Sequence, residues 1–546
     1  MMKSNELFRA SGIMALGTII SRITGFIRGL LVVAVLGSAL LADTYTVADT
    51  MPNIIYNLLI GGALTAVFIP QLVRSHIQED GGDGFASRLI TTVALLMGIL
   101  VIIGMVFAPY LVRLYAPEFF TLGFESERDI AIAFTRYCLP QIFFMGLFTM
   151  LGQAANARGS FGPLMWAPIA NNLTGILLFG SFLIFAPSVS LNTITPSQVQ
   201  ILGWGTSFCV SMQVLVLIPI IRRLGIRIRP QFGLQGLRKS FNLAGWTLLY
   251  VFISQLGYLV TVNIATSAAV RSAKEGITNG VGYTPYTFAY SIMLLPYSIV
   301  TISIVTAILP HLSKLVLANN IFEVKVQIIR AVRLVATITI PSGLAFVFFG
   351  PLITRVLFIG IPIQDARFIG HVLSALGLGL VPFSINLILI RGFNAFEDTR
   401  TQVISILVIN IISVSLSFAF LSILPNQWVT VGLGASFSLS YLFGVFVTLQ
   451  LLKKHIKSIR GTDFLWQHAR LFASAGLVIV PIFLASQWLE ANIAERGRVS
   501  LGIELLSIMV LVLFGYYYTA KAFKVEEITM IRHLKNSVLR RPGAAE

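Results

Sequence analysis

Fourteen long apolar runs divide this chain of 546 residues, and they constrain its fold more than any other feature. A membrane-spanning helix needs about 20 mostly apolar residues, and most of these runs reach that length. Only 11% of the residues are charged, against about 25% in soluble domains, so a water-soluble protein is excluded. We expect an all-α polytopic membrane protein of about 14 transmembrane helices, formed by residues 10–37, 42–72, 87–112, 130–156, 163–186, 201–221, 241–270, 282–311, 331–354, 368–391, 399–424, 429–452, 467–488 and 499–522.

The basic residues follow a topological pattern. With the N-terminus placed in the cytoplasm, only eight of the 39 Lys and Arg fall outside, and Arg22, Arg28 and Arg136 lie within the runs, away from their ends. The segment from Arg222 to Lys239 alone carries six positive charges on the inside. This positive-inside pattern predicts that both termini are cytoplasmic. The net charge of +17 therefore reflects topology, and nucleic acid is not expected as a partner.

The motifs of soluble enzymes are missing from the sequence. It contains no phosphate-binding Gly-rich loop, no His-Glu-x-x-His and no Cys-x-x-Cys. Cys138 and Cys209 lie in apolar runs, which favours core positions over a disulfide. The first run is interrupted by Arg22 and Arg28 and is too long for a cleavable signal. We therefore expect a transporter that is not an enzyme and has no metal site.

Short matches between the two halves indicate an internal repeat. The offset of 240 or 242 residues spans six runs, so both copies face the same way, as in transporters built from parallel repeats. Two unrelated halves with similar helix ends are the alternative. We predict an N-lobe over 1–225, a C-lobe over 226–460, two further helices over 461–522 and a basic tail over 523–546. The matching pairs are Phe68–Arg74 with Ile308–Lys314, Ala108–Arg113 with Gly350–Arg355, and Leu139-Pro140 with Val381-Pro382.

Two arginines and no acid lie in the first run. Arg22 and Arg28 are six residues apart, about 9 Å along a helix axis. Charges within the membrane usually face a cavity or a partner, and guanidinium pairs bidentately with phosphate oxygens. The favoured interpretation is a site for a large anion such as a pyrophosphate. The alternative is a pair of structural ion pairs with acids of the second run.

The second run carries a polar stripe. Asp49, Asn53 and Asn57 recur at intervals of four, with Asp43 earlier in the run. Such a stripe lines a water-filled space or bonds a neighbouring helix. Asn172 in the fifth run is open to the same two interpretations.

Asn394 and Asp398, four residues apart, could hold a small hard cation with their oxygens. The more common role of such a pair is an acidic start to a cytoplasmic helix.

Several segments, in order along residues 8–520, resemble the MurJ (MviN) family, and most closely its actinobacterial members. They are Ser21–Arg28, Leu36–Asp43, Pro52-Asn53, Gly62-Ala63, Phe68–Pro70, Asn156–Gly159, Trp166–Asn172, Leu249–Gly257, Leu309-Pro310 and Phe393–Thr401.

The resemblance implies fourteen helices in two six-helix lobes plus two, within the MOP exporter superfamily. It also implies a flippase that moves lipid II, the undecaprenyl-pyrophosphate-linked peptidoglycan precursor, from the inner to the outer leaflet of the bacterial inner membrane. At the positions that match the family motifs, Arg22 and Arg28 would contact the headgroup in a cationic cavity. Asp43 would be the acid of the second helix, and Asn172 would be an amide that lines the cavity. A groove at the last two helices would hold the lipid tail. Asp398 matches a motif position at which some members hold sodium, and no other cofactor is implied.

The sequence departs from the family pattern at three places. Gly29 follows Arg28 where many members have Asp, Tyr56-Asn57 replaces paired arginines, and Tyr290-Ser291 replaces an Asp-Arg pair. Tighter anion binding by Arg22 and Arg28 alone and a weakened flippase are both open. The expected partners are lipid II, membrane lipids and cell-wall synthesis proteins. The alternatives are a flippase for another polyprenyl-linked glycan, a MATE-like cation-coupled exporter, and a scaffold without transport.

Overall fold

The computed structural model describes residues 4–58, 83–160, 162–186, 189–226, 229–231, 238–277, 280–457, 461–492, 497–525 and 527. Within these residues every regular element is helical, and 13 helical segments are long and apolar enough to cross a membrane. The predicted all-α polytopic fold is therefore confirmed. The predicted run 42–72 continues beyond the described residues, as does the repeat segment Phe68–Arg74.

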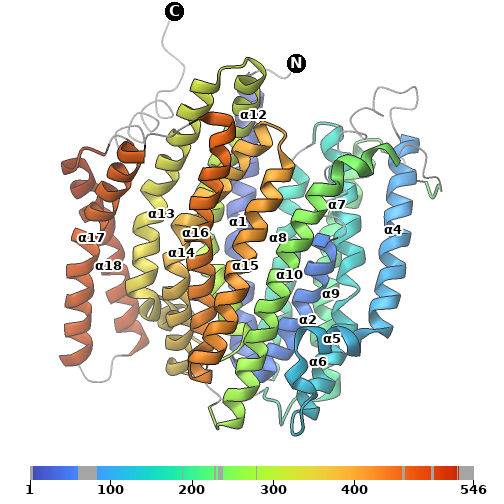
Figure 1. Ribbon diagram of the computed structural model, residues 1–546. Coiled ribbons are helices and arrows are strands. Elements are labelled where there is room, and N and C mark those ends of the chain that lie inside the picture. The colour runs from blue at the N-terminus through green and yellow to red at the C-terminus, as the bar shows by residue number, and fades with distance from the viewer. Residues whose placement is uncertain are drawn as a thin grey trace, which may run out of the picture. The chain divides into compact units, whose positions relative to one another are not determined.

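By its internal contacts the chain forms two units, and the first comprises residues 1–285, 358–362 and 418–430. Figure 1 shows long helices running side by side within this unit. Its elements are α1 (Ser4–Leu36), α2 (Leu40–Tyr56), α4 (Asp83–Val106), α5 (Ala108–Tyr115), η2 (Pro117–Phe120), α6 (Glu125–Cys138), α7 (Gln141–Ala157), α8 (Gly162–Phe185), α9 (Pro196–Arg223), α10 (Arg238–Lys274) and η4 (Asn426–Trp428). By contacts α10 belongs to this unit, and the lobe boundaries given above remain predictions.

Local sequence explains where several of these helices begin and end. At the start of α9, Thr195 accepts a hydrogen bond from the Gln198 N–H, and Gln198 accepts one from the Thr195 N–H, which forms a capping box. Pro196 occupies the first turn, where its missing N–H costs nothing. Pro140 separates α6 from α7 within one predicted run.

The second unit comprises residues 286–357, 363–417 and 431–546. Most of its apolar core lies among α12, α13, α14 and the two last helices, of which α17 packs on α13 and α18 (Figure 1). Its elements are α11 (Tyr283–Pro296), η3 (Tyr297–Thr301), α12 (Ile302–Leu317), α13 (Ile321–Leu357), α14 (Ile363–Ala395), α15 (Thr399–Ile423), α16 (Val429–Ile456), α17 (Gly461–Asn492) and α18 (Arg498–Ala522). Of these, α11 and α16 begin in unit 1, and α15 ends in it.

Glycines bring α13 and α14 into close contact. A Cβ at Gly343 would lie 2.9 Å from the Gly377 carbonyl oxygen, and one at Gly350 would lie 2.5 Å from that of Gly370. Gly343 and Gly350 are seven residues apart on α13, and Gly370 and Gly377 are seven apart on α14, so the two glycines of each helix lie on one face. Small residues at such a crossing let two backbones approach closely, which is how membrane helices gain packing energy in lipid.

Candidate functional site

The predicted anion site lies on α1, which packs along α8 within unit 1 (Figure 1). Gly175 of α8 leaves room for Arg28, because a Cβ there would lie 2.6 Å from Arg28 Cδ. The half-buried guanidinium of Arg28 donates from Nη1 to Asn171 Oδ1 at 3.2 Å. Asp49 of α2 acts on Arg28 electrostatically but does not form an ion pair with it. Arg28 is therefore oriented by an amide, and no carboxylate among the described residues forms an ion pair with it.

Arg22 has a different environment. It is exposed, and no hydrogen bond or ion pair joins it to any residue that the structure describes. The two arginines share no protein partner. Neither arginine forms an ion pair with a carboxylate of the described residues, so the alternative of structural ion pairs finds no support there. A role of both arginines in anion binding stays a prediction.

Asn172 connects α8 to α1. Its Nδ2 donates to the Ser21 carbonyl oxygen at 2.8 Å and to Thr24 Oγ1 at 3.1 Å, and its side chain is buried. Gly25 lies against the same amide, since a Cβ there would be 3.3 Å from Asn172 Nδ2. Asn172 thus forms an interhelical bond, and its neighbour Asn171 is the amide that contacts Arg28. A cavity role for Asn172 stays a prediction.

Asp43 caps a helix that begins far away in the sequence. Its Oδ2 accepts a hydrogen bond from the Tyr283 N–H at 3.0 Å, and its Oδ1 accepts one from the Thr284 N–H at 2.7 Å. These are the first residues of α11, where N–H groups lack helical partners and the helix dipole favours an anion. Gly282 permits this approach, because a Cβ there would lie 2.1 Å from Asp43 Oδ2. The buried carboxylate is fully used by this cap.

The rest of the polar stripe of α2 bonds within unit 1. Asp49 Oδ1 accepts a hydrogen bond from Gln141 Nε2 of α7 at 3.0 Å, and Asn53, which is exposed, donates to the Asp49 carbonyl oxygen at 3.1 Å. Asp49 therefore joins two helices, while the carbonyl oxygen of the exposed Asn53 side chain accepts no hydrogen bond from the residues that the structure describes. Whether the stripe lines a substrate cavity stays a prediction.

The candidate cation pair lies in unit 2, around the start of α15. Asp398 Oδ1 accepts from the Thr401 N–H at 3.0 Å, and its Oδ2 accepts from Thr401 Oγ1 at 2.6 Å and lies 2.8 Å from His455 Nε2. Asn394 Oδ1 accepts a hydrogen bond from Gln402. Burial alone would raise the pKa of the Asp398 carboxyl, but these hydrogen bonds and the imidazole hold that pKa below its usual value.

This arrangement is a helix cap, because the Asp398 side chain satisfies the N–H three residues on. A cation at Asn394 and Asp398 would compete with Gln402 and His455 for these oxygens. Among the residues described, no three His, Cys, Asp or Glu side chains form a metal-binding group. Cation binding here stays a prediction.

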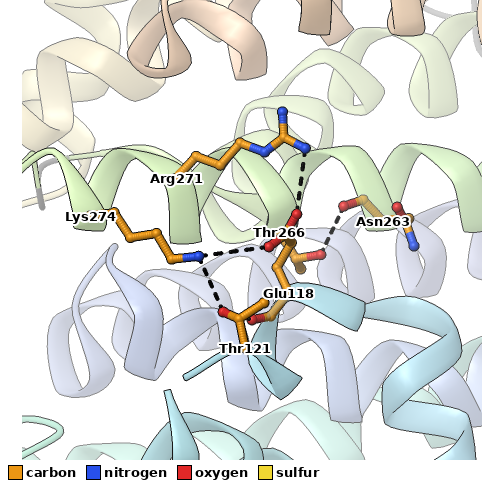
Figure 2. Close-up of polar contacts among 6 residues, drawn as sticks. All are labelled: Glu118, Thr121, Asn263, Thr266, Arg271 and Lys274. Atoms are coloured by element: carbon orange, nitrogen blue, oxygen red, sulfur yellow. Dashed lines mark hydrogen bonds and ion pairs between the residues drawn. The ribbon is translucent and has the colours of Figure 1, made fainter. Parts of the chain in front are cut away.

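A polar cluster that no sequence motif indicated joins the second half of α10 to the end of α5 and to η2 with the residue after it (Figure 2). Glu118 Oε1 lies 3.4 Å from Arg271 Nη2, and its Oε2 lies 4.0 Å from Lys274 Nζ. Lys274 also donates to Thr121 Oγ1 at 3.3 Å. One turn or more earlier, Asn263 and Thr266 donate to the carbonyl oxygens of Leu114 and Tyr115, each at 3.3 Å. We call this cluster the α10 latch.

The sequence gives one indication of the α10 latch, which is that opposite charges occur in two segments predicted to lie outside the membrane on the same side. Arg271 and Lys274 belong to the eight basic residues predicted to lie outside, and Glu118 lies in another outside segment. Sequence separation of about 150 residues concealed their pairing.

Comparison with known proteins gives one consistent result. The family profile described as "Lipid II flippase MurJ" matches residues 32–509. "Probable lipid II flippase MurJ" of Rhizobium meliloti (strain 1021) is 26% identical over 94% of each chain. "Lipid II flippase MurJ" of Burkholderia cenocepacia is 23% identical, over 94% of this chain and 96% of that one.

Solved structures show the same fold at lower identity. The structure titled "Lipid II flippase MurJ, inward closed conformation" aligns with a TM-score of 0.71 at 19% identity, over 93% of this chain and 99% of that chain. An inward-facing multidrug resistance MATE family transporter of the MOP superfamily aligns with a TM-score of 0.63 at 14% identity, over 82% of this chain and 99% of that one. These structures support the fold alone.

Proposed function

From the premise that this chain belongs to the MurJ family of lipid II flippases, as its match to the family profile over residues 32–509 shows, we propose how it moves lipid II between the leaflets. The chain is a multi-pass protein of the bacterial inner membrane, its substrate is lipid II, and it acts in peptidoglycan biosynthesis as a transporter and not as an enzyme. The distribution of Lys and Arg supports the further proposal that both termini are cytoplasmic. The α10 latch and the Asp43 cap then lie on the outer side.

The headgroup binds at α1. The observation that carries this step is a pair of arginines, one exposed and one oriented by Asn171, neither of which forms an ion pair with a described carboxylate. A pyrophosphate carries about two negative charges, and guanidinium binds phosphate oxygens through paired, charge-assisted hydrogen bonds. A cationic drug would be repelled by the same side chains, which disfavours a MATE-like exporter. A different polyprenyl-linked glycan would be bound by the same contacts, so specificity for lipid II rests on family membership.

Transport proceeds by alternating access. The polar headgroup is shielded while its tail stays in lipid, and the outer side opens when α10 separates from η2. An inside-negative membrane potential contributes about 2.3 kcal/mol per charge per 100 mV, and it favours outward movement of an anionic headgroup. An ion gradient is the alternative source of energy. Protein partners are expected among the cell-wall synthesis proteins that consume lipid II at the outer leaflet.

Complementation tests this function. The chain is expressed in a bacterium depleted of its own lipid II flippase, and lipid II exposed at the outer leaflet is measured. We expect the wild type to restore exposure and an Arg22→Ala/Arg28→Ala double variant to lose it. An Arg113→Ala/Arg128→Ala double variant, which removes two positive charges elsewhere in unit 1, should still restore exposure. Failure of the correctly inserted wild type would refute lipid II flipping by this chain.

A further inference from the structure

Aromatic rings from α11, η3, α14 and α16 pack against one another within unit 2. Neighbouring ring centroids lie 4.3–6.2 Å apart, which is close to the usual spacing of aromatic pairs. We call this group the aromatic cluster. Its members are Tyr286, Tyr290, Tyr297, Phe383, Phe437 and Tyr441.

The aromatic cluster is not closed off as a core. Tyr286 is buried, whereas the other five members are half-buried. The Tyr290 hydroxyl forms no hydrogen bond with any residue that the structure describes. A tyrosine hydroxyl withdrawn from water usually has a partner. The cluster therefore offers accessible ring surface and a hydroxyl that can bond a ligand.

The accessible rings of α16 are turned away from lipid. Phe437 and Tyr441 are four residues apart and share one face of the helix. Leu442, Phe443 and Phe446 are 55–63% exposed, and they lie about 100–200° around the helix from Tyr441. These exposed apolar side chains mark the lipid-facing side, so the cluster lies on the side where a polar headgroup would be shielded.

The backbone departs from α-helical geometry at the same place. Pro296 ends α11, and Tyr297–Thr301 form the π-helical turn η3. Tyr297, the first residue of this turn, stacks on Phe383 with the ring centroids 4.3 Å apart and the planes inclined by 25°. Single π-helical turns frequently occur at functional sites. This observation is independent of the exposure of the rings and supports the same conclusion.

The chemistry of the cluster suits a neutral ligand that carries hydroxyl groups. The helical segments that form it, residues 283–301, 372–390 and 429–452, contain no Asp, Glu, Lys, Arg or His, so they offer a phosphate no counter-charge. The face of an aromatic ring carries partial negative charge, and the C–H groups on the face of a sugar ring carry partial positive charge, so the two stack. A sugar also has hydroxyl groups that can bond the Tyr290 hydroxyl.

We propose that the aromatic cluster binds the sugar of the transported headgroup and contributes specificity for the glycan. The inference rests on the proposed function, in which Arg22 and Arg28 bind the pyrophosphate. Those arginines would hold any polyprenyl-linked glycan in the same way, so selection by the sugar needs a second contact. The cluster includes Tyr290 at a position where the family pattern has an Asp-Arg pair and this chain has Tyr290-Ser291.

Native mass spectrometry of the purified full chain tests the proposal without measuring transport. Two lipids are titrated separately, undecaprenyl pyrophosphate and the same lipid carrying one N-acetylhexosamine and no peptide. We expect Tyr290→Leu to bind the sugar-bearing lipid about three- to tenfold more weakly than wild type, because stacking is lost. Its affinity for undecaprenyl pyrophosphate should not change, which also shows that the variant is folded.

Two further variants serve as controls. Tyr290→Phe keeps the ring and should lose less affinity for the sugar-bearing lipid than Tyr290→Leu. Phe348→Leu removes a ring from another aromatic pair of unit 2, in which Phe348 and Phe483 have centroids 5.1 Å apart. It should bind both lipids as wild type does.

The outcomes separate this inference from the proposed function. Equal weakening of both lipids by Tyr290→Leu would assign the cluster to the tail, the pyrophosphate or the fold, and would overturn the inference. Unchanged binding of the sugar-bearing lipid, equal loss in Tyr290→Phe, or the same loss in Phe348→Leu would overturn it as well. Failure of the wild type to bind either lipid would instead refute the headgroup site at α1, and the inference that rests on it.

Discussion

At the scale of single residues, the two arginines of α1 differ in what the protein does for them. Arg28 is positioned by Asn171 and by the space that Gly175 leaves, whereas Arg22 is exposed and contacts no described polar partner. Residues that stabilise a fold make contacts within it. Arg22 makes no such polar contact among the described residues, so its proposed role in headgroup binding can be tested without a large effect on stability.

Replacing Arg22 therefore separates function from stability. We expect Arg22→Ala to change the free energy of unfolding by less than about 0.5 kcal/mol, as for a surface substitution, and to lower lipid II flipping at least about tenfold, because one charge-assisted contact is lost. Thermal unfolding in detergent and flipping in proteoliposomes measure the two effects. A variant that flips at the wild-type rate would remove Arg22 from the headgroup site.

At the scale of elements, the α1–α8 contact determines where Arg28 can lie. Gly175→Ala would place a methyl group 2.6 Å from Arg28 Cδ and displace the guanidinium from Asn171. The side chain is flexible, so we expect little loss of stability but slower flipping. Gly180→Ala on the same helix is the matched control, because a Cβ there has no neighbour within 4 Å. Equal flipping rates in the two variants would contradict the positioning of Arg28 by α8.

The start of α15 makes a prediction about pH. The folded-state pKa of Asp398 is lowered, so its contribution to stability is complete above its unfolded value of about 4. That contribution is lost as pH falls through the lowered folded value. Asn can still accept the cap hydrogen bond but carries no charge. We therefore expect Asp398→Asn to be less stable than wild type by about 0.3–1 kcal/mol at pH 7, from the lost interaction of the anion with the helix dipole, and the difference to shrink in strong acid. Melting temperatures of both proteins at pH 7 and below pH 4 measure this, and a difference that is independent of pH would contradict the cap.

At the scale of the whole molecule, transport requires that contacts on one side break while those on the other form. The α10 latch is suited to such a role, since its charged groups are partly exposed. Exposed ion pairs contribute only about 0–1 kcal/mol. A latch of that strength biases an equilibrium between conformations without preventing its reversal.

Weakening the α10 latch should favour the outward-open state. We expect Glu118→Gln to raise the outward-open population up to about fivefold, as loss of roughly 1 kcal/mol predicts. Labelling of a Ser267→Cys probe by an impermeant thiol reagent from outside measures this, because Ser267 of α10 is buried and so are Cys138 and Cys209. Arg128→Gln is the control, because its partner Asp129 is the adjacent residue and does not hold α10. Unchanged labelling would exclude the latch from gating.

The sequence by itself determined what depends on local composition. Apolar runs, their charge asymmetry and the ordered motifs predicted the all-α membrane fold and the family, because a segment's hydrophobicity and length decide whether it can span a bilayer. The motif residues Arg22, Arg28 and Asp398 could likewise be singled out from the sequence. What each one contacts could not be predicted in this way.

Only the tertiary structure decided those partners. Asp43 caps α11 through residues about 240 positions away, Glu118 meets Arg271 and Lys274 across about 150, and His455 is brought to Asp398 from another helix. A hydrogen bond or ion pair depends on distance and direction to within a few tenths of an ångström. The packing of helices far apart in the chain sets both, and no local pattern of residues records them.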